Sequence, residues 1–132
     1  MKAEILYAPA GRALLVGLTL LAATACGSSR NAFSESGQGS YYADKFDGRR
    51  TASGEVYRPG HLTAAHNSLP FGTRIRVTNV RTGRSVKVTV NDRGPHVKGR
   101  IVDLSKRAAS KIGLVDAGVA PVRLKVLRTG RK

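Results

Sequence analysis

Residues 86–103, VKVTVNDRGPHVKGRIVD, decide how the rest of the chain is interpreted. Apolar residues alternate with polar ones at its start, which predicts a β-strand with one buried face: Val86, Val88 and Val90. The next residue in that phase is Asp92, so a core-facing row ends in a carboxylate. Gly94 and Pro95 then break the strand, because proline lacks a backbone donor and glycine adopts unusual dihedral angles. We therefore expect Asp92 at the rim of a sheet.

Further short segments with the same alternation follow along the chain. Two of them, residues 73–79 and 85–90, are joined by a turn that contains Gly83, which predicts a β-hairpin. Residues 100–104 and 121–128 predict two more strands. Ser105 is a suitable N-cap for a helix over residues 106–112 that Gly113 would end. Many short strands with one small helix favour a closed barrel with an aliphatic core.

Length and charge limit the functional classes. The chain has 132 residues, no tryptophan and a net charge of +15, which fits one small domain with an anionic partner. Nucleic acid is the usual partner of such a basic protein, but an exported protein meets little of it. We therefore expect no nucleic acid, and favour an acidic cell-wall polymer or anionic lipid headgroups.

The N-terminus has the pattern of an export signal. Basic residues precede a short apolar run, residues 13–23, which is shorter than a membrane span. Cys26 is the only cysteine and lies where cleavage would occur, so we expect it to be the lipid-modified first residue of a lipoprotein. The alternative is simple secretion. Gly27 and the serines after it are typical of lipoproteins sent to the outer membrane.

This pattern divides the chain into four parts. Residues 1–26 are the predicted signal peptide, residues 27–39 a flexible tether, residues 40–128 the barrel domain and residues 129–132 a basic tail. The tether is assigned because it is polar and has no hydrophobic periodicity.

Three polar residues are candidates for chemistry: Asp92, Glu55 and His66. In so basic a chain an acid can simply neutralise an arginine, and a lone histidine can simply be packed. Tyr41, Tyr42 and Phe46 have flat rings that suit sugar faces, or they cap the barrel. The three histidines lack metal-ligand spacing, so we expect neither a metal nor another cofactor.

Ordered motif blocks resemble the rare lipoprotein A family over nearly the whole domain, from Ser40 to about Arg128. The blocks are SYY at 40–42, FDGRRTASGE at 46–55, LTAAH at 62–66, LPFGT at 69–73, VTN at 77–79, VNDRGP at 90–95 and GRIVDLS at 99–105. The resemblance implies a mainly β fold, a six-stranded double-psi β-barrel with one or two short helices. It also implies a cell-envelope protein that acts on peptidoglycan glycan strands, and we expect a monomer.

For active members the resemblance implies lytic transglycosylase chemistry. The bond between N-acetylmuramic acid and N-acetylglucosamine is cleaved without water, which leaves a 1,6-anhydro-muramoyl end. One carboxyl can serve first as acid and then as base, and by similarity that carboxyl is Asp92. The alternatives are a barrel that binds glycan without cleaving it, as expansin-like proteins do, and a lipoprotein that only bridges membrane and wall.

The resemblance also suggests roles for the other residues. Glu55 corresponds to a second acid that stabilises charge on the sugar or positions its C6 hydroxyl, and His66 is expected to hydrogen-bond Asp92 or the substrate. We expect Tyr41, Tyr42, Asn91 and Arg93 to contact substrate. The guanidinium of Arg93 is expected to point away from Asp92, toward substrate or a structural carboxylate.

Overall fold

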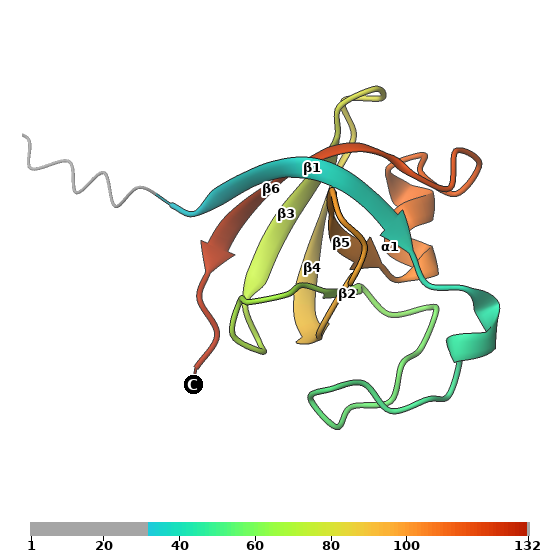
Figure 1. Cartoon of the computed structure of the whole chain (residues 1–132), viewed down its shortest axis with the longest axis vertical. Coiled ribbons are helices and arrows are strands. Elements are labelled where there is room, and N and C mark those ends of the chain that lie inside the picture. The colour runs from blue at the N-terminus through green and yellow to red at the C-terminus, as the bar shows by residue number, and fades with distance from the viewer. Residues whose placement is uncertain (1–31, 132) are drawn as a thin grey trace, which may run out of the picture.

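The computed structural model describes residues 32–131, which form a closed β-barrel (Figure 1). The strands follow one another around the barrel in the order β1-β5-β2-β4-β3-β6. The elements are β1 (Ser34–Tyr41), the 3-10 helix η1 (Asp44–Phe46), β2 (Thr63–Ala65), β3 (Arg74–Asn79), β4 (Ser85–Asp92), β5 (Arg100–Leu104), α1 (Lys106–Lys111) and β6 (Ala120–Arg128). The predicted signal peptide and lipidated Cys26 lie outside the described residues.

The predicted hairpin and helix are confirmed. β3 and β4 pair antiparallel, and their inward residues meet as Ile75 opposite Val88 and Val77 opposite Val86. These side chains belong to a buried aliphatic core, as expected from the alternation. Ser105 caps α1, since its hydroxyl accepts a hydrogen bond from the Ala108 amide. Gly113 follows the helix with a φ of 69°, the left-handed conformation that ends many helices.

Two parallel strand pairs give the barrel its double-psi topology. β1 pairs parallel to β5 and β2 pairs parallel to β4, whereas the other neighbouring pairs are antiparallel. The fold expected from the family resemblance is therefore confirmed. Because β2 and β4 run in the same direction, His66 just after β2 lies beside Asp92 at the end of β4, and the His66 amide donates to the Asp92 carbonyl at 3.1 Å.

The tether prediction is wrong over its second half, because residues 34–39 belong to β1. This strand pairs with β6 from Ser34 opposite Lys125 to Gly39 opposite Ala120. Within residues 34–39 the partly or fully buried positions are Glu35, Gly37 and Gly39, so no apolar alternation marks this part of the strand. A Cβ on Gly39 would come within 2.9 Å of a Val122 methyl, so glycine allows the two strands to approach.

A long connection between β1 and β2, seen in green in Figure 1, leaves the barrel before it returns to β2. It begins with η1 and is held at its base by the isolated bridge between Arg50 and Val56. The Ser53 amide donates to the Asn91 carbonyl at 3.2 Å, which fixes this loop against the end of β4. None of the described helices has the length and apolar composition needed to cross a membrane.

Candidate functional site

A pocket of about 530 Å³ opens where β1, β4 and β5 reach the rim of the barrel. The end of β1, the turn that follows β4, and β5 supply its walls. Two carboxylates, Asp92 and Asp103, line it together with an aromatic wall formed by Tyr41, Tyr42 and Phe46. The rim position predicted for Asp92 is confirmed, since it is the last residue of β4 and Gly94 turns the chain with a φ of 119°.

The Asp92 carboxylate is held by three donors. The Tyr42 hydroxyl donates to Oδ2 at 2.5 Å, and the amides of Ala52 and Arg93 donate to Oδ1 at 2.8 Å and 2.9 Å. One donor comes from the residue directly after β1, one from the long loop and one from the chain directly after β4. Three separate segments thus converge on one half-buried carboxyl group, which fixes its orientation in the pocket.

Tyr42 is itself fixed by an aromatic stack. Its ring lies parallel to the buried ring of Tyr57 at a centroid distance of 4.4 Å, and it meets Phe46 edge to face at 5.9 Å. Burial, together with the hydrogen bond to Asp92 and the nearby charge of that carboxylate, raises the pKa of Tyr42 far above its ordinary value. The phenol therefore stays protonated and remains a donor to Asp92.

Asp103 is a pocket residue that the sequence did not lead us to select as a candidate. It forms an ion pair with Arg100 on the same strand, and the Ser40 hydroxyl donates to the same carboxylate oxygen at 3.0 Å. Asp103 lies between Val102 and Leu104, both fully buried. An acid between two core residues of a strand, three positions after an arginine, is the signal that could have identified it.

Glu55 and Asn91 lie beside the pocket rather than in its wall. The Asn91 amide donates to the Glu55 carboxylate at 3.2 Å, and Asn91 is buried with 4% of its surface exposed. Asn91 therefore holds the loop and is absent from the pocket lining, so its contact with substrate stays a prediction. The loop that carries Glu55 also carries Ala52, whose amide donates to Asp92. The Glu55 carboxylate itself does not line the pocket.

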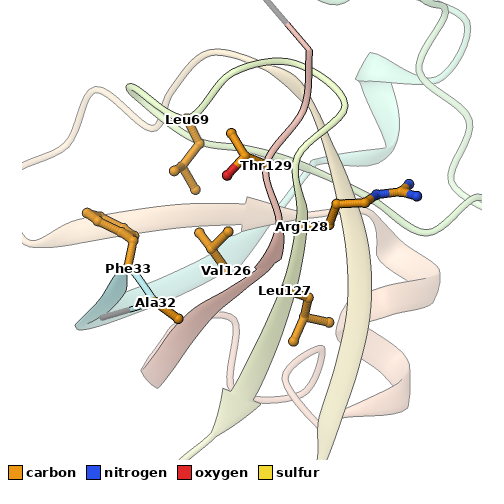
Figure 2. A pocket seen from close by; sticks show the side chains of 7 residues that line it. All are labelled: Ala32, Phe33, Leu69, Val126, Leu127, Arg128 and Thr129. Atoms are coloured by element: carbon orange, nitrogen blue, oxygen red, sulfur yellow. The ribbon is translucent and has the colours of Figure 1, made fainter. Parts of the chain in front are cut away.

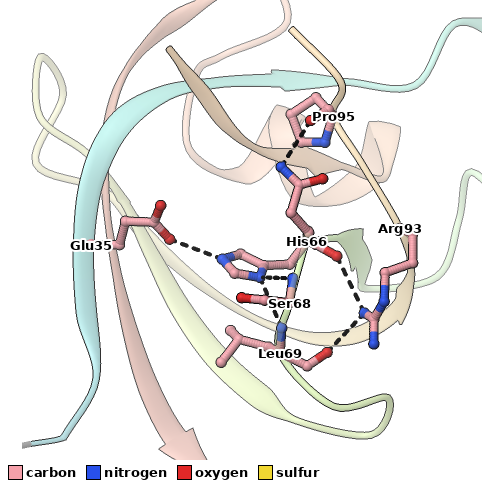
Figure 3. Close-up of polar contacts among 7 residues, drawn as sticks. Glu35, His66, Ser68, Leu69, Arg93 and Pro95 are labelled. Atoms are coloured by element: carbon pink, nitrogen blue, oxygen red, sulfur yellow. Dashed lines mark hydrogen bonds and ion pairs between the residues drawn. The ribbon is translucent and has the colours of Figure 1, made fainter. Parts of the chain in front are cut away.

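The predicted hydrogen bond from the His66 side chain to Asp92 is wrong, and its contact with substrate stays a prediction. The imidazole is buried, with 3% exposed, and Figure 3 shows it directed toward Glu35 on β1. Its Nδ1 accepts from the Ser68 and Leu69 amides, both at 3.1 Å, so the proton is on Nε2 and is donated to Glu35 at 2.9 Å. His66 shapes the turn after β2.

The turn after β2 also binds Arg93, the residue after Asp92. The guanidinium donates to the carbonyls of His66 and Leu69 at 3.2 Å and 2.8 Å, as Figure 3 shows, and lies 4.1 Å from the centroid of the Phe71 ring. Arg93 thus points away from the carboxylate of Asp92, and its partners are backbone carbonyls rather than a structural carboxylate. Arg93 also lines the pocket, and its contact with substrate stays a prediction. Its contribution is to fix the backbone whose amide binds Asp92.

Tyr41 both lines the pocket and packs against the hydrophobic core. Its hydroxyl donates to the Val115 carbonyl at 3.2 Å, while part of the side chain lines the pocket. Over residues 32–131 no group of three or more His, Cys, Asp or Glu side chains is arranged to hold a metal ion.

Comparisons with known proteins agree with this architecture. A family model described as lytic transglycolase matches residues 34–124. A probable endolytic peptidoglycan transglycosylase RlpA from Nostoc sp. is 58% identical over 93 residues, which is 69% of this chain and 25% of that protein. The endolytic peptidoglycan transglycosylase RlpA of Pasteurella multocida is 48% identical over 100 residues, or 76% of this chain and 34% of that protein. The chain thus spans well under half the length of these relatives.

Solved structures share the fold at low sequence identity. The Streptomyces papain inhibitor superposes with a TM-score of 0.59 at 24% identity, covering 73% of this chain and 96% of that one. An expansin from Clavibacter michiganensis has the same TM-score at 20% identity and covers 76% of this chain and 53% of its own. At such identities the likeness concerns the barrel alone.

Proposed function

The chain belongs to the lytic transglycolase family, and on that premise we propose that it cleaves peptidoglycan glycan strands without hydrolysis. The bond cleaved is the one between N-acetylmuramic acid and N-acetylglucosamine. The observation that carries the proposal is the pocket itself, in which an oriented carboxylate, Asp92, faces a space of about 530 Å³ beside a second carboxylate and an aromatic wall.

In the proposed reaction the Asp92 carboxyl, in its protonated form, gives its proton to the glycosidic oxygen as the bond to the muramoyl C1 breaks. The resulting carboxylate then accepts the proton of the muramoyl C6 hydroxyl as its oxygen bonds to C1. The product is a 1,6-anhydro ring, no water is consumed, and Asp92 ends protonated as it began. This cycle needs one carboxyl in a fixed position, which the three donors to Asp92 supply.

Asp103 takes the electrostatic role that the sequence suggested for Glu55. Its carboxylate, which forms an ion pair with Arg100, lies in the pocket wall, and its negative charge beside the sugar stabilises the positive charge that develops at C1. Glu55 is then a positioning residue, because it acts through Asn91 and the loop that carries Ala52.

The test is to incubate the protein with peptidoglycan, intact and stripped of its stem peptides, and to analyse the products by mass spectrometry. We expect 1,6-anhydro-muramoyl ends that disappear in Asp92→Asn and decrease strongly in Asp103→Asn. Asp116→Asn, an exposed acid outside the pocket lining, is the matched control. Reducing muramic acid ends would indicate hydrolysis, and an active Asp92→Asn beside an inactive Asp103→Asn would reverse the two assignments.

A second candidate is glycan binding without cleavage. It is favoured by the expansin-like barrel, since a variant of the Clavibacter michiganensis expansin has been solved in complex with cellohexaose. Sedimentation of the protein with peptidoglycan and no anhydro products, while a known transglycosylase works under the same conditions, would select this candidate.

The proposed cellular setting is the envelope, with the chain anchored through an acyl group on Cys26 to the outer membrane and the barrel facing the periplasm. The support is the sequence pattern before and at Cys26. Cys26→Ala should release the protein from membranes that are washed with high salt to remove electrostatic binding, and unchanged partitioning after that wash would contradict the anchor.

A further inference from the structure

The outer surface of β3, β4 and β6 carries a group of lysines and arginines that we call the basic face: Arg74, Arg76, Lys87, Arg123, Lys125 and Arg128. All of them are exposed except Arg74, which is half-buried. The strand register places like charges directly opposite one another. Arg76 lies opposite Lys87 on one side and opposite Lys125 on the other, and Arg74 lies opposite Arg128.

Within residues 32–131, no ion pair joins any member of the basic face to an acid. Cross-strand pairs of like charge destabilise a sheet, so this arrangement is unfavourable to the isolated fold. The one acidic residue in β3, β4 and β6 is Asp92, which is the last residue of β4 and lies in the pocket. A surface of this kind is stabilised when an external anion lies against it.

An apolar pocket adjoins the basic face at the end of β6. It measures about 620 Å³ and is lined by Phe33, Leu69, Val126 and Leu127 together with Arg128. Figure 2 shows Phe33, Leu69 and Val126 gathered on one side of this strand end, with Arg128 directed away from them. Phe33 and Leu127 are 46% and 40% exposed, which is large for such side chains.

The combination of a cationic sheet surface and exposed apolar groups at its border matches the surface of a bilayer. Anionic headgroups satisfy the lysines and arginines, and the apolar side chains enter the boundary beneath the headgroups. A soluble polyanion would satisfy only the charges. We propose that the basic face and its apolar border bind an anionic phospholipid bilayer, independently of any acyl group on Cys26.

This docking fixes which way the candidate site faces. Around the closed barrel, β3 is at the centre of the basic face, and β5 is the strand farthest from it in either direction. β5 carries Arg100 and Asp103 of the pocket wall. A barrel that rests on a membrane through β3 therefore turns the β5 wall of its pocket away from the lipid. This inference goes beyond the proposed cleavage and does not depend on it.

The first test measures binding of the full chain, carrying Cys26→Ala, to vesicles of phosphatidylcholine alone or mixed with phosphatidylglycerol. We expect salt-sensitive binding to the anionic vesicles, and a loss of about 25-fold in R76Q/K125Q, since each basic residue at such a surface contributes about fivefold. The control K98Q/K111Q removes the same charge from exposed positions elsewhere and should retain most of the affinity. Equal losses in the two variants would overturn the proposal.

The second test measures how the barrel is oriented on the membrane. The chain has no tryptophan, so Leu127→Trp and Val97→Trp each introduce a single reporter, the first at the apolar border and the second at the pocket. We expect a blue shift on anionic vesicles at position 127 and none at 97. The same spectrum at both positions would overturn the proposal. So would an unchanged spectrum at 127 combined with tight, R76Q/K125Q-sensitive binding to soluble polyphosphate, because the partner would then be a polyanion in solution. Glycan cleavage is assayed without vesicles, so its failure is a separate result.

Discussion

At the scale of single residues, the hydrogen bond from Tyr42 to Asp92 is the contact that prepares the site. Tyr42→Phe keeps the ring that stacks on Tyr57 and removes only the donor. Loss of one hydrogen bond to a charged group should lower the turnover number about tenfold with little change in KM, since Asp92 loses its orientation rather than its access to substrate. The measurement is anhydro-product formation against glycan concentration. Tyr41→Phe, which loses a bond to the Val115 carbonyl instead, should keep its turnover number.

The same tyrosine predicts how stability changes at alkaline pH. The folded state raises the pKa of Tyr42, so above about pH 10 the unfolded chain releases this proton while the folded protein retains it. Stability from this group is complete below that pH and is lost as pH rises further. Urea unfolding should therefore show a steeper alkaline fall in the wild type than in Tyr42→Phe. Tyr57 is present in both proteins, and parallel curves would contradict the prediction.

His66 predicts a loss of stability rather than of chemistry. His66→Ala would leave the Ser68 and Leu69 amides without their acceptor and Glu35 without its donor, so we expect a cost of about 2–4 kcal/mol in the free energy of unfolding. Denaturant unfolding measures this cost. His96→Ala removes an exposed imidazole and should cost almost nothing. An equal effect of the two changes would argue against a structural role for His66.

At the scale of elements, β1 depends on close approach to its neighbours. Gly39→Val places a branched side chain where even a Cβ would be 2.9 Å from a Val122 methyl, so overpacking should cost about 1–3 kcal/mol. Val122→Ala should restore part of the loss in the double variant, because it removes the methyls that clash. Additive costs in thermal unfolding of the double variant would show that the two residues do not interact.

Whether a strand can be predicted from the sequence depends on which residue types lie at its inward-facing positions. β3, β4 and β6 carry valine, leucine or isoleucine there, and all were predicted. β1 carries Glu35 and glycines, and β2 is only Thr63–Ala65, so neither shows periodicity. Asp92 was found because it continues an apolar row, whereas Tyr57 and the Glu35–His66 pair depend on contacts between distant segments. The family resemblance identified His66 but not its partner.

At the scale of the whole molecule, the charge of +15 makes the fold repel itself. Part of this repulsion is local to the basic face, where Arg76 lies between Lys87 and Lys125. The barrel therefore has a basic surface that is least stable when nothing anionic covers it. Its pocket is walled mainly by β1 and β5, which do not belong to that surface. The proposed membrane contact uses the outer surface of β3, β4 and β6, whereas the proposed cleavage uses the end of β4 together with β1 and β5.

Salt should consequently stabilise this protein. Raising the ionic strength shortens the range of repulsion to about 3 Å at 1 M, so the midpoint of thermal unfolding should rise by several degrees between low salt and that concentration. R76Q/K125Q should begin with a higher midpoint in low salt and gain less from added salt, because the strongest cross-strand repulsion has been removed. K98Q/K111Q lowers the net charge equally but leaves the basic face intact, so its salt response should stay close to that of the wild type. Calorimetry of the three proteins decides between the local and the global origin: matching salt responses in the two double variants would mean that net charge alone, not strand register, sets the repulsion.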